Sequence, residues 1–269
     1  MQTSGLQFAY KPGMSTTMST TIVKEVASYY NSNGSPVYAC LLDASKAFDR
    51  IRYDKLFQTL LDRKFPPVYI KLLMDCYMNQ KIQVKWGCDR STPFKGQNGV
   101  RQGGVISPIL FTVYIDSLVS LLKKGKAGCR IGHHFYGCII YADDIILLCP
   151  SVTGLQKMVD ICSEFGLNYA ITFNGKKCKC IMFGSNEIDT PEIILNGETL
   201  IWEETAMHVG NVLNRNLDDE DDVREKQFAF FNQVNVLCAD FQGVNCDILG
   251  ELFGKYCRSF FFMEANLGI

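Results

Sequence analysis

Two adjacent aspartates, Asp143 and Asp144, lie between two apolar runs within residues 139–148. Each run has the length and composition of a buried strand, and burying an unpaired carboxylate costs several kcal/mol. We therefore expect a cation or another positive group beside the two carboxylates. The plainer interpretation is a hairpin turn, where Asp is common. That interpretation is favoured for these residues alone, and the rest of the chain reverses the preference.

A third aspartate follows another apolar run. Residues 37–42 are typical of a buried strand, which would deliver Asp43 at its C-terminal end. If this strand shares a sheet with the hairpin, three carboxylates gather, and their hard oxygens suit Mg²⁺. Two such ions about 3.5–4 Å apart clamp the attacking and leaving oxygens of an in-line phosphoryl transfer. The aspartates therefore indicate metal-assisted phosphoryl transfer, in which the protein supplies position and charge.

Residues 96–106 form a glycine-rich segment that carries Arg101 and Gln102. Glycine lets a backbone approach a ligand closely, so this segment is a candidate ligand-binding loop; a floppy surface loop is the alternative. Ser107 and Pro108 favour the cap and the first position of a helix over residues 109–122. A loop anchored to a helix in this way is more typical of a site than of a tether.

The composition is that of a soluble globular protein, with 47% hydrophobic and 20% charged side chains among 269 residues. No apolar run has the length of a membrane span, and Met1 begins no signal-peptide pattern. We expect an intracellular protein, cytoplasmic or nuclear or both, with no membrane partner. Twelve cysteines are scattered, and neither they nor the three histidines have zinc-ligand spacing, so we expect no zinc site and no disulfide scaffold.

Charge is divided sharply along the chain. Residues 1–186 carry 22 Lys and Arg against 12 Asp and Glu, a net charge of +10, whereas residues 187–269 carry 5 against 16, or −11. A basic field around acidic site residues suits a polyanionic substrate held over a metal. The plainer interpretation is a set of ordinary solvated lysines.

Periodicity predicts the elements that must position these residues. A helix capped by Ser15 or Thr16 precedes the first strand, and the alternation at 81–86 favours a half-exposed strand. The Asn-Gly pair within 193–201 predicts a hairpin. The other expected elements are helices over 54–63 with Asp54 as cap, 67–78 beginning at Pro67, and 155–165, strands at 169–173, 178–184 and 208–213, and a last helical region opened by the acids at 218–222.

Several of these segments resemble the motifs of one family. Residues 43–50, 99–111 and 141–148 closely resemble three core motifs of reverse transcriptases, in the form found in non-LTR (LINE-type) retrotransposons. The resemblance covers about residues 5–215, and several motifs in the family's order make it more specific than any single motif. Three further segments resemble the segment just before the palm (7–16), the lysine-bearing fourth palm motif (173–177) and the primer-grip hairpin (208–210).

The resemblance implies an α+β fold, a right-hand polymerase palm with an antiparallel sheet backed by helices. Residues 1–36 would be partial fingers, residues 37–215 the palm with inserted fingers elements and the primer-grip hairpin, and residues 216–269 the connection and the start of a truncated thumb. The implied function is RNA-directed DNA polymerisation. Its partners would be an RNA template, a DNA primer and dNTPs, and its cofactor two Mg²⁺ ions, for which Mn²⁺ can substitute.

The resemblance also implies roles for single residues. Asp43 and Asp143 would bind both metals, with the Ala44 carbonyl assisting and Asp144 close by. Phe48 falls on the family's steric-gate position, where a ring beneath the sugar leaves no room for a 2′-hydroxyl. Lys11, Arg101, Gln102 and Gly103 are expected at the incoming nucleotide, and Tyr141, Ala142, His208, Val209 and Gly210 at the primer.

A lysine completes the set of implied catalytic residues. By the resemblance, Lys177 would protonate or neutralise the departing pyrophosphate. A solvated turn lysine is the alternative, and Lys176 and Lys179 are rivals because spacing is the only guide.

The chain departs from the family pattern at several points. Lys11 stands where an arginine is usual, and Asn211 stands where an apolar residue is usual. The basic fingers hairpin, most of the thumb and an endonuclease are not found in these residues, so we expect an endonuclease on a fuller polyprotein. The alternative function is a catalytically silent retrotransposon-derived fragment that binds nucleic acid or a partner, although its aspartates are intact. A nucleotidyl cyclase with a similar palm has no use for the loop at 99–108.

Overall fold

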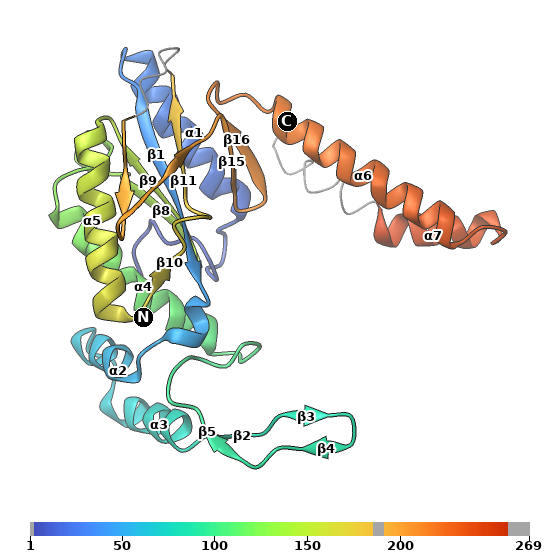
Figure 1. The fold of residues 1–269 in the computed structure, drawn as a ribbon, viewed down its shortest axis with the longest axis horizontal. Helices are drawn as coiled ribbons and strands as arrows, with labels where there is room; N and C mark the ends of the chain where they lie inside the picture. Colours follow the sequence, from blue (N-terminus) through green and yellow to red (C-terminus); the bar gives the residue numbers. More distant parts are fainter. Residues whose placement is uncertain (1–2, 185–190, 258–269) are drawn as a thin grey trace.

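The structure is a computed structural model that describes residues 3–184 and 191–257. Its centre is a sheet with the strand order β14-β11-β1-β9-β8, to which β10 is joined through β1 (Figure 1). The central strand β1 (Val37–Ser45) runs antiparallel to β9 (Asp144–Cys149) on one side. On its other side it pairs first with β11 (Lys179–Phe183) and then with β10 (Thr172–Phe173), both antiparallel. The edge strands are β8 (Cys138–Tyr141) and β14 (Ile201–Trp202).

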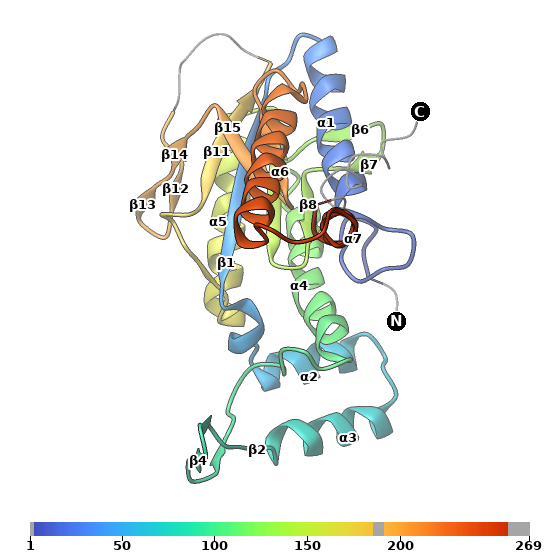
Figure 2. The same ribbon diagram turned by 90° about the vertical axis from the view of Figure 1, so that its right-hand side faces the viewer.

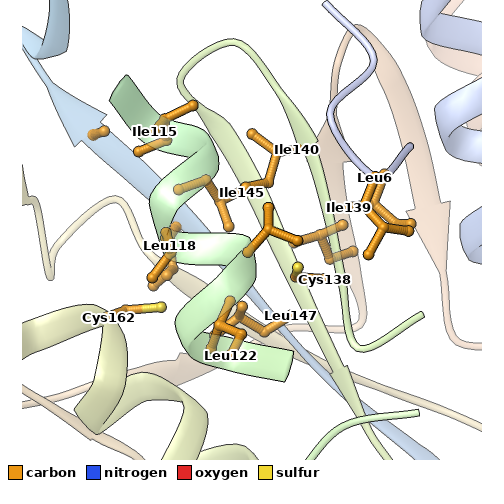
Figure 3. Packing of buried hydrophobic residues seen from close by; sticks show 14 of the residues in the cluster. Leu6, Ile115, Leu118, Leu122, Cys138, Ile139, Ile140, Ile145, Leu147 and Cys162 are labelled. Carbon is orange, nitrogen blue, oxygen red and sulfur yellow. The ribbon is translucent and has the colours of Figure 1, made fainter. Parts of the chain in front are cut away.

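Long helices cover this sheet because its strands are apolar along most of their length. The helices α4 (Ser107–Lys124) and α5 (Val152–Tyr169) pack on each other, and α5 also packs on β9 and β1. Leu122 of α4, Leu147 of β9 and Cys162 of α5 are wholly buried, and they lie together in Figure 3. The core thus holds the acidic hairpin and the central strand in one rigid layer.

The helix before the central strand begins where the sequence predicts. α1 is Thr16–Ser32, and the hydroxyl of Ser15 accepts a hydrogen bond from the Met18 N–H, as expected for an N-cap. α1 packs against β8 and β1. In the part of the chain that the structure describes, no helix is both long and apolar enough to cross a membrane.

One end of the molecule is an extension that leaves the sheet (Figure 2). It contains α2 (Tyr53–Asp62), α3 (Pro67–Met78) and four two-residue strands. The predicted start of α3 at a proline is confirmed, but the predicted cap of α2 is wrong. Arg52 precedes α2, and Asp54 lies inside the helix and pairs with the Arg52 guanidinium at 2.7 Å. The short strands are β2 (Lys81–Ile82), β3 (Lys85–Trp86), β4 (Asp89–Arg90) and β5 (Phe94–Lys95).

The strand predicted at 81–86 is therefore only partly correct. β2 pairs with β5 and β3 with β4, so the segment forms a long hairpin whose strand is broken in two. Every residue of these strands is exposed, including Ile82 and Trp86, so neither face of the hairpin is buried. The hairpin projects from the molecule without a core of its own.

Small hairpins surround the rest of the sheet. The predicted Asn-Gly hairpin is confirmed as β12 (Ile194–Leu195) and β13 (Glu198–Thr199), with Asn196 and Gly197 at φ 52° and 84°. β6 (Arg130–Ile131) and β7 (His134–Phe135) form another before β8. The predicted strand at 208–213 is wrong, because these residues span the turn of a hairpin between β15 (Thr205–His208) and β16 (Asn211–Asn214).

The C-terminal part extends away from the sheet (Figure 1). It consists of α6 (Glu220–Asp240), with the predicted acids in its first turn, and α7 (Cys246–Tyr256). α6 contacts β16 and α7, and it exposes Phe228 and Phe231, each more than 60% accessible. The arm is thus attached at its base and exposes aromatic side chains along α6.

Candidate active site

The three predicted aspartates come together at one end of the central strand. Asp43 of β1 and Asp144 of β9 are register partners on adjacent antiparallel strands, and Asp143 lies in the turn before β9. Ala142 in that turn has φ 56°, which brings β8 and β9 together through a tight connection. Asp43 is not at the end of its strand as predicted, because β1 continues to Ser45. The sheet register, and not a side-chain contact, sets the spacing of these carboxylates.

The electrostatics of this cluster agree with its geometry. Burial raises the pKa of Asp144, and the negative charges of Asp143 and Asp43 raise it further. Lys177 lies in the turn before β11, and its Nζ is 3.9 Å from Asp43 Oδ2. Its side chain is 66% exposed, so this ion pair is weak by itself. The cluster therefore retains an excess of negative charge.

Carboxylates in this arrangement fit a hard cation. Among the described residues, no three Asp, Glu, His or Cys side chains converge closely enough to enclose an ion on their own. Mg²⁺ is commonly held by only one or two carboxylates together with substrate phosphates and water. The half-buried Asp43 and the exposed Asp143, with excess negative charge beside them, match that pattern. Ala44, whose carbonyl is predicted to assist, follows within β1 and is buried.

Phe48 lies beside the acids in a single 3-10 turn, Ala47–Arg50. Its half-buried ring stacks on Phe111 of α4, with ring centroids 4.3 Å apart and planes at 16°. The backbone enters the turn through Lys46, which has φ 52°. The stack on Phe111 supports the Phe48 ring against α4.

The glycine-rich loop is fastened to this turn. The Val100 N–H donates to the Phe48 carbonyl at 2.9 Å, and Gln102 Nε2 donates to Asp49 Oδ1 at 3.0 Å. Gly99 has φ +86°, and a Cβ there would lie 2.7 Å from the Asp49 carbonyl oxygen, so only glycine fits. The loop is thus fastened to the turn that follows β1 and is not a floppy tether.

The other loop residues point in different directions. Arg101 Nε donates to Gln80 Oε1 at 3.1 Å, toward the extension, and Gly103 has φ +79° with open space around it. The predicted helix cap at Ser107 is wrong: α4 includes Ser107, whose buried hydroxyl lies 3.4 Å from the Tyr77 hydroxyl. Gln102 thus bonds to the turn that contains Phe48, whereas Arg101 bonds to the Gln80 side chain.

The segment before α1 contributes residues that the sequence reasoning did not single out. Residues 6–8 pair with β8, and the wholly buried Gln7 accepts hydrogen bonds from the Ala142 N–H at 3.4 Å and the Ala9 N–H at 3.1 Å. Burial raises the pKa of Tyr10, and Asp143 adds to that shift. A lone polar residue between apolar Leu6 and Phe8 was the available signal for Gln7.

Lys11 makes a local contact near the start of the described chain. Its Nζ donates to the Ser4 carbonyl at 2.5 Å, and burial lowers its pKa. The expected role of Lys11 at the incoming nucleotide stays a prediction. In this arrangement the lysine fastens the start of the chain.

Some of the predicted primer residues are buried, and others reach the surface. Val209 and Gly210 form the turn between β15 and β16, at φ 49° and 78°, and reach the surface. His208 is buried at 2% exposure, its Nε2 has no hydrogen-bond partner, and burial lowers its pKa to about 4. Its side chain therefore faces the interior. In the acidic hairpin, Tyr141 is half-buried and Ala142 is buried.

Asn211 replaces the expected apolar residue with a polar link. Its Nδ2 lies 3.3 Å from Thr20 Oγ1 of α1, and its Oδ1 accepts from Lys226 of α6 at 3.2 Å. The buried Asp222 accepts from the Val212 N–H at 2.7 Å, which joins α6 to β16. The departure at Asn211 therefore fastens the C-terminal arm to the hairpin.

Comparison with known proteins shows the family to which the chain belongs. The sequence profile of the family described as "Reverse transcriptase (RNA-dependent DNA polymerase)" matches residues 1–235, most of the chain. The chain belongs to the reverse transcriptase family. The sheet, the acidic hairpin and the fastened loop are thus the palm of a reverse transcriptase, with the metal dependence that is general in the family.

Relatives place this reverse transcriptase among the non-LTR retrotransposons. It is 28% identical over 158 residues to the retrovirus-related Pol polyprotein from type-2 retrotransposable element R2DM of Drosophila melanogaster, covering 59% of this chain and 15% of the relative. It is 25% identical over 203 residues to the RNA-directed DNA polymerase from mobile element jockey of Drosophila funebris, covering 73% of this chain and 22% of the relative. The chain thus spans less than a quarter of the length of either.

Solved structures support the fold. Telomerase of Candida tropicalis in complex with a fragment of telomeric RNA matches with a TM-score of 0.59 and 16% identity, over 83% of this chain and 37% of that one. The apo telomerase truncated from its C-terminal domain, from the same organism, matches with a TM-score of 0.57 and 17% identity, over 75% and 39%. The predicted α+β polymerase palm is confirmed.

Proposed function

We propose that this reverse transcriptase chain is the polymerase core of a non-LTR retrotransposon, which adds dNTPs to the 3′ end of a DNA primer on an RNA template. The observation that carries the proposal is the register of β1 and β9. It sets Asp43 opposite Asp144, with Asp143 in the adjoining turn, at a surface that remains open. A cluster of this kind would hold the metal ions that nucleotidyl transfer requires.

Asp43 and Asp143 would hold two Mg²⁺ ions, with Mn²⁺ as the substitute. Such ions stabilise the charge that develops on the attacking and leaving oxygens of a phosphoryl transfer. Asp144 adds negative charge beside them; its pKa is raised first by burial and then by the charges of Asp143 and Asp43. The part of the fold is to keep these carboxylates in register on paired strands.

Other residues would position the nucleotide and neutralise its products. Phe48, held by its stack on Phe111, would exclude a 2′-hydroxyl by size. Gln102, bonded to Asp49, would lie beside the incoming nucleotide. Lys177 is the best placed of the three lysines in its segment, because its Nζ is within 4 Å of Asp43, whereas Lys179 pairs with Glu203 at 3.2 Å.

The domain assignment follows the same proposal. Residues 1–36 would be partial fingers, 37–215 the palm with inserted fingers elements and the primer-grip hairpin, and 216–269 the connection and start of a thumb. The extension that contains α2, α3 and the β2–β5 hairpin supplies the inserted elements. An endonuclease would belong to the fuller polyprotein, because this chain covers only 15% of its R2DM relative.

Primer extension tests the proposal directly. The purified chain, incubated with oligo(dT) on poly(rA), dTTP and Mg²⁺ or Mn²⁺, should extend the primer, and EDTA should stop it. Asp43→Asn and Asp143→Asn should abolish extension while circular dichroism shows an intact fold. The exposed Asp89→Asn, remote from the cluster, should extend normally.

Two outcomes would contradict the assignment. Near-normal extension by either aspartate variant would remove those residues from the metal site. Duplex binding by the wild type without extension, at any metal concentration tried, would favour the alternative of a catalytically silent nucleic-acid-binding fragment.

A further inference from the structure

The central strand changes partners beside the candidate active site. β1 pairs with β11 up to Leu41, which lies opposite Lys179, and with β10 from Ala44, which lies opposite Phe173. Between these two pairs β1 advances by three residues while the opposite chain covers six. The extra residues form the turn at 174–178, so the ladder is interrupted at the height of Asp43.

This turn forms only one of the two backbone hydrogen bonds expected with Asp43. In an antiparallel ladder, the two residues of a hydrogen-bonded pair exchange two N–H···O bonds. The Asn174 N–H donates to the Asp43 carbonyl at 3.0 Å, as such a pair requires. The Asn174 carbonyl, however, accepts from the N–H groups of Lys177 and Cys178 at 2.9 Å each, inside the turn. The Asp43 N–H therefore loses its expected backbone acceptor.

A thiol takes the place of that acceptor. The Asp43 N–H donates to Cys178 Sγ at 3.4 Å. Cys178 is 1% exposed and directly precedes β11, so its side chain is fixed at the point where the two strands separate. Sulfur is a weak acceptor, but a buried N–H without any partner would be costly.

We propose that Cys178 is a positioning residue of the reverse transcriptase site. Its thiol holds the backbone of Asp43 against the turn that carries Lys177, whose Nζ is 3.9 Å from the Asp43 carboxylate. The catalytic consequence rests on the proposed function, whereas the contact itself can be tested without substrate or metal. The Cys178 side chain thus fixes the position of Asp43 relative to the turn that carries Lys177.

Hydrogen–deuterium exchange with residue-level resolution tests the contact in the metal-free chain. Cys178→Ala removes the acceptor, whereas Cys178→Ser retains one. The Asp43 amide should exchange at least about tenfold faster in Cys178→Ala, because its protecting bond is gone, and the Leu41 amide should change by less than about twofold. Cys178→Ser should restore most of the protection.

Cys180→Ala is the matched control. Cys180 is also a buried cysteine, two residues further along, but it lies opposite Cys40 and away from Asp43. This variant should leave the Asp43 amide at its wild-type rate. A wild-type Asp43 amide that exchanges like an unprotected one would overturn the proposal, and so would an unchanged rate in Cys178→Ala. The wild-type and serine measurements decide the matter even if the alanine variant fails to fold.

Primer extension separates this inference from the proposed function. Cys178→Ala should lower kcat at least tenfold with little change in the KM for dTTP, and Cys178→Ser should recover it. Faster exchange at Asp43 together with a wild type that never extends a primer would sink the function and leave the contact standing. Faster exchange together with normal kcat would show that the contact does not position the catalytic carboxylate.

Discussion

At the scale of single residues, the candidate site places like charges side by side. Burial and the neighbouring carboxylates raise the pKa of Asp144, so the folded chain binds its proton more readily than the unfolded chain does. Its protonated form therefore stabilises the fold below the ordinary carboxyl pKa of 3.8, and this stabilisation is lost as the pH rises through the raised value. At neutral pH the ionised cluster destabilises the metal-free fold.

Asp144→Asn should consequently raise the Tm at pH 7 in EDTA, because the variant removes one of the repelling charges. The rise should stay within the roughly 2–4 °C that 1 kcal/mol represents in a chain of this size. It should shrink toward zero near pH 3, where the wild-type carboxyl is protonated. Differential scanning calorimetry at both pH values measures it, with the exposed Asp89→Asn as control. A lower Tm at pH 7 would contradict the argument.

Phe48→Val should admit ribonucleotides if the ring excludes a 2′-hydroxyl by size. The ratio of kcat/KM for dTTP over UTP should narrow, chiefly through a lower KM for UTP. Stability should fall by about 1–2 kcal/mol, because the variant also loses the stack on Phe111. Phe165→Leu loses another stacked ring, on Tyr169, and controls for that destabilisation without touching the site. An unchanged ratio would place the gate at another residue.

At the scale of elements, apolar runs were enough to predict the sheet, because strands buried by helices must be apolar. The neighbours of a residue were not predictable in the same way. His208 is a polar residue between Met207 and Val209, and its burial depends on the packing of the β15–β16 hairpin. Asp54 has the chemistry of a helix cap, yet α2 begins at Tyr53, and Asp54 lies inside the helix and pairs with Arg52. Lys11 fits a nucleotide site by type, but it bonds to Ser4.

The attachment of the glycine-rich loop gives a prediction at this scale. Gly99→Ala should destabilise the fold by about 1–3 kcal/mol, because φ is +86° and the new methyl group would clash with the Asp49 backbone. Gly103→Ala is the matched control, since its φ is +79° but open space surrounds it, so about 1 kcal/mol is expected. Urea unfolding compares the two. Equal costs would mean that the clash at Gly99 is relieved by movement of the loop.

The β15–β16 hairpin should make stability depend on pH. His208 has a folded-state pKa lowered to about 4 by burial, below its ordinary value of 6.5, so the unfolded chain binds more protons between these values. Stability should fall as the pH drops from about 6.5 to about 4, by at most about 3 kcal/mol. His208→Leu should lose this dependence, and the exposed His134→Gln should keep it. Urea unfolding at pH 7.5 and pH 4.5 measures this change in the free energy of unfolding. An equal change in the wild type and both variants would exclude His208 as its source.

At the scale of the whole molecule, charge and apolar surface are unevenly placed. The acidic last third includes α6 and α7, whose rings contact one another, as Phe230 does Phe231 and Phe253, yet leave apolar surface exposed. Phe228 and Phe231 are 66% and 61% exposed. Contiguous apolar surface of this kind promotes association.

The chain should therefore self-associate at micromolar concentration. Phe228→Ser with Phe231→Ser should shift it toward monomer in size-exclusion chromatography with light scattering, and its Tm should change little because neither ring is buried. The double substitution Val68→Ser and Leu72→Ser on α3 removes comparable exposed side chains and serves as control. A monodisperse wild-type monomer would show that the exposed rings of α6 do not drive association.

The β2–β5 hairpin has a different consequence. Its eight strand residues are all exposed, and the hairpin contacts little but itself, so no cooperative unit of the fold protects it. Local opening there should cost almost nothing, whereas opening β1 requires disruption of the whole sheet. The free hairpin therefore has conformational entropy that an ordered complex would lose. A polyanion that engages Lys81, Lys85 and Lys95 has to remove that entropy, which lowers affinity but lets the hairpin adapt to strands of different shape.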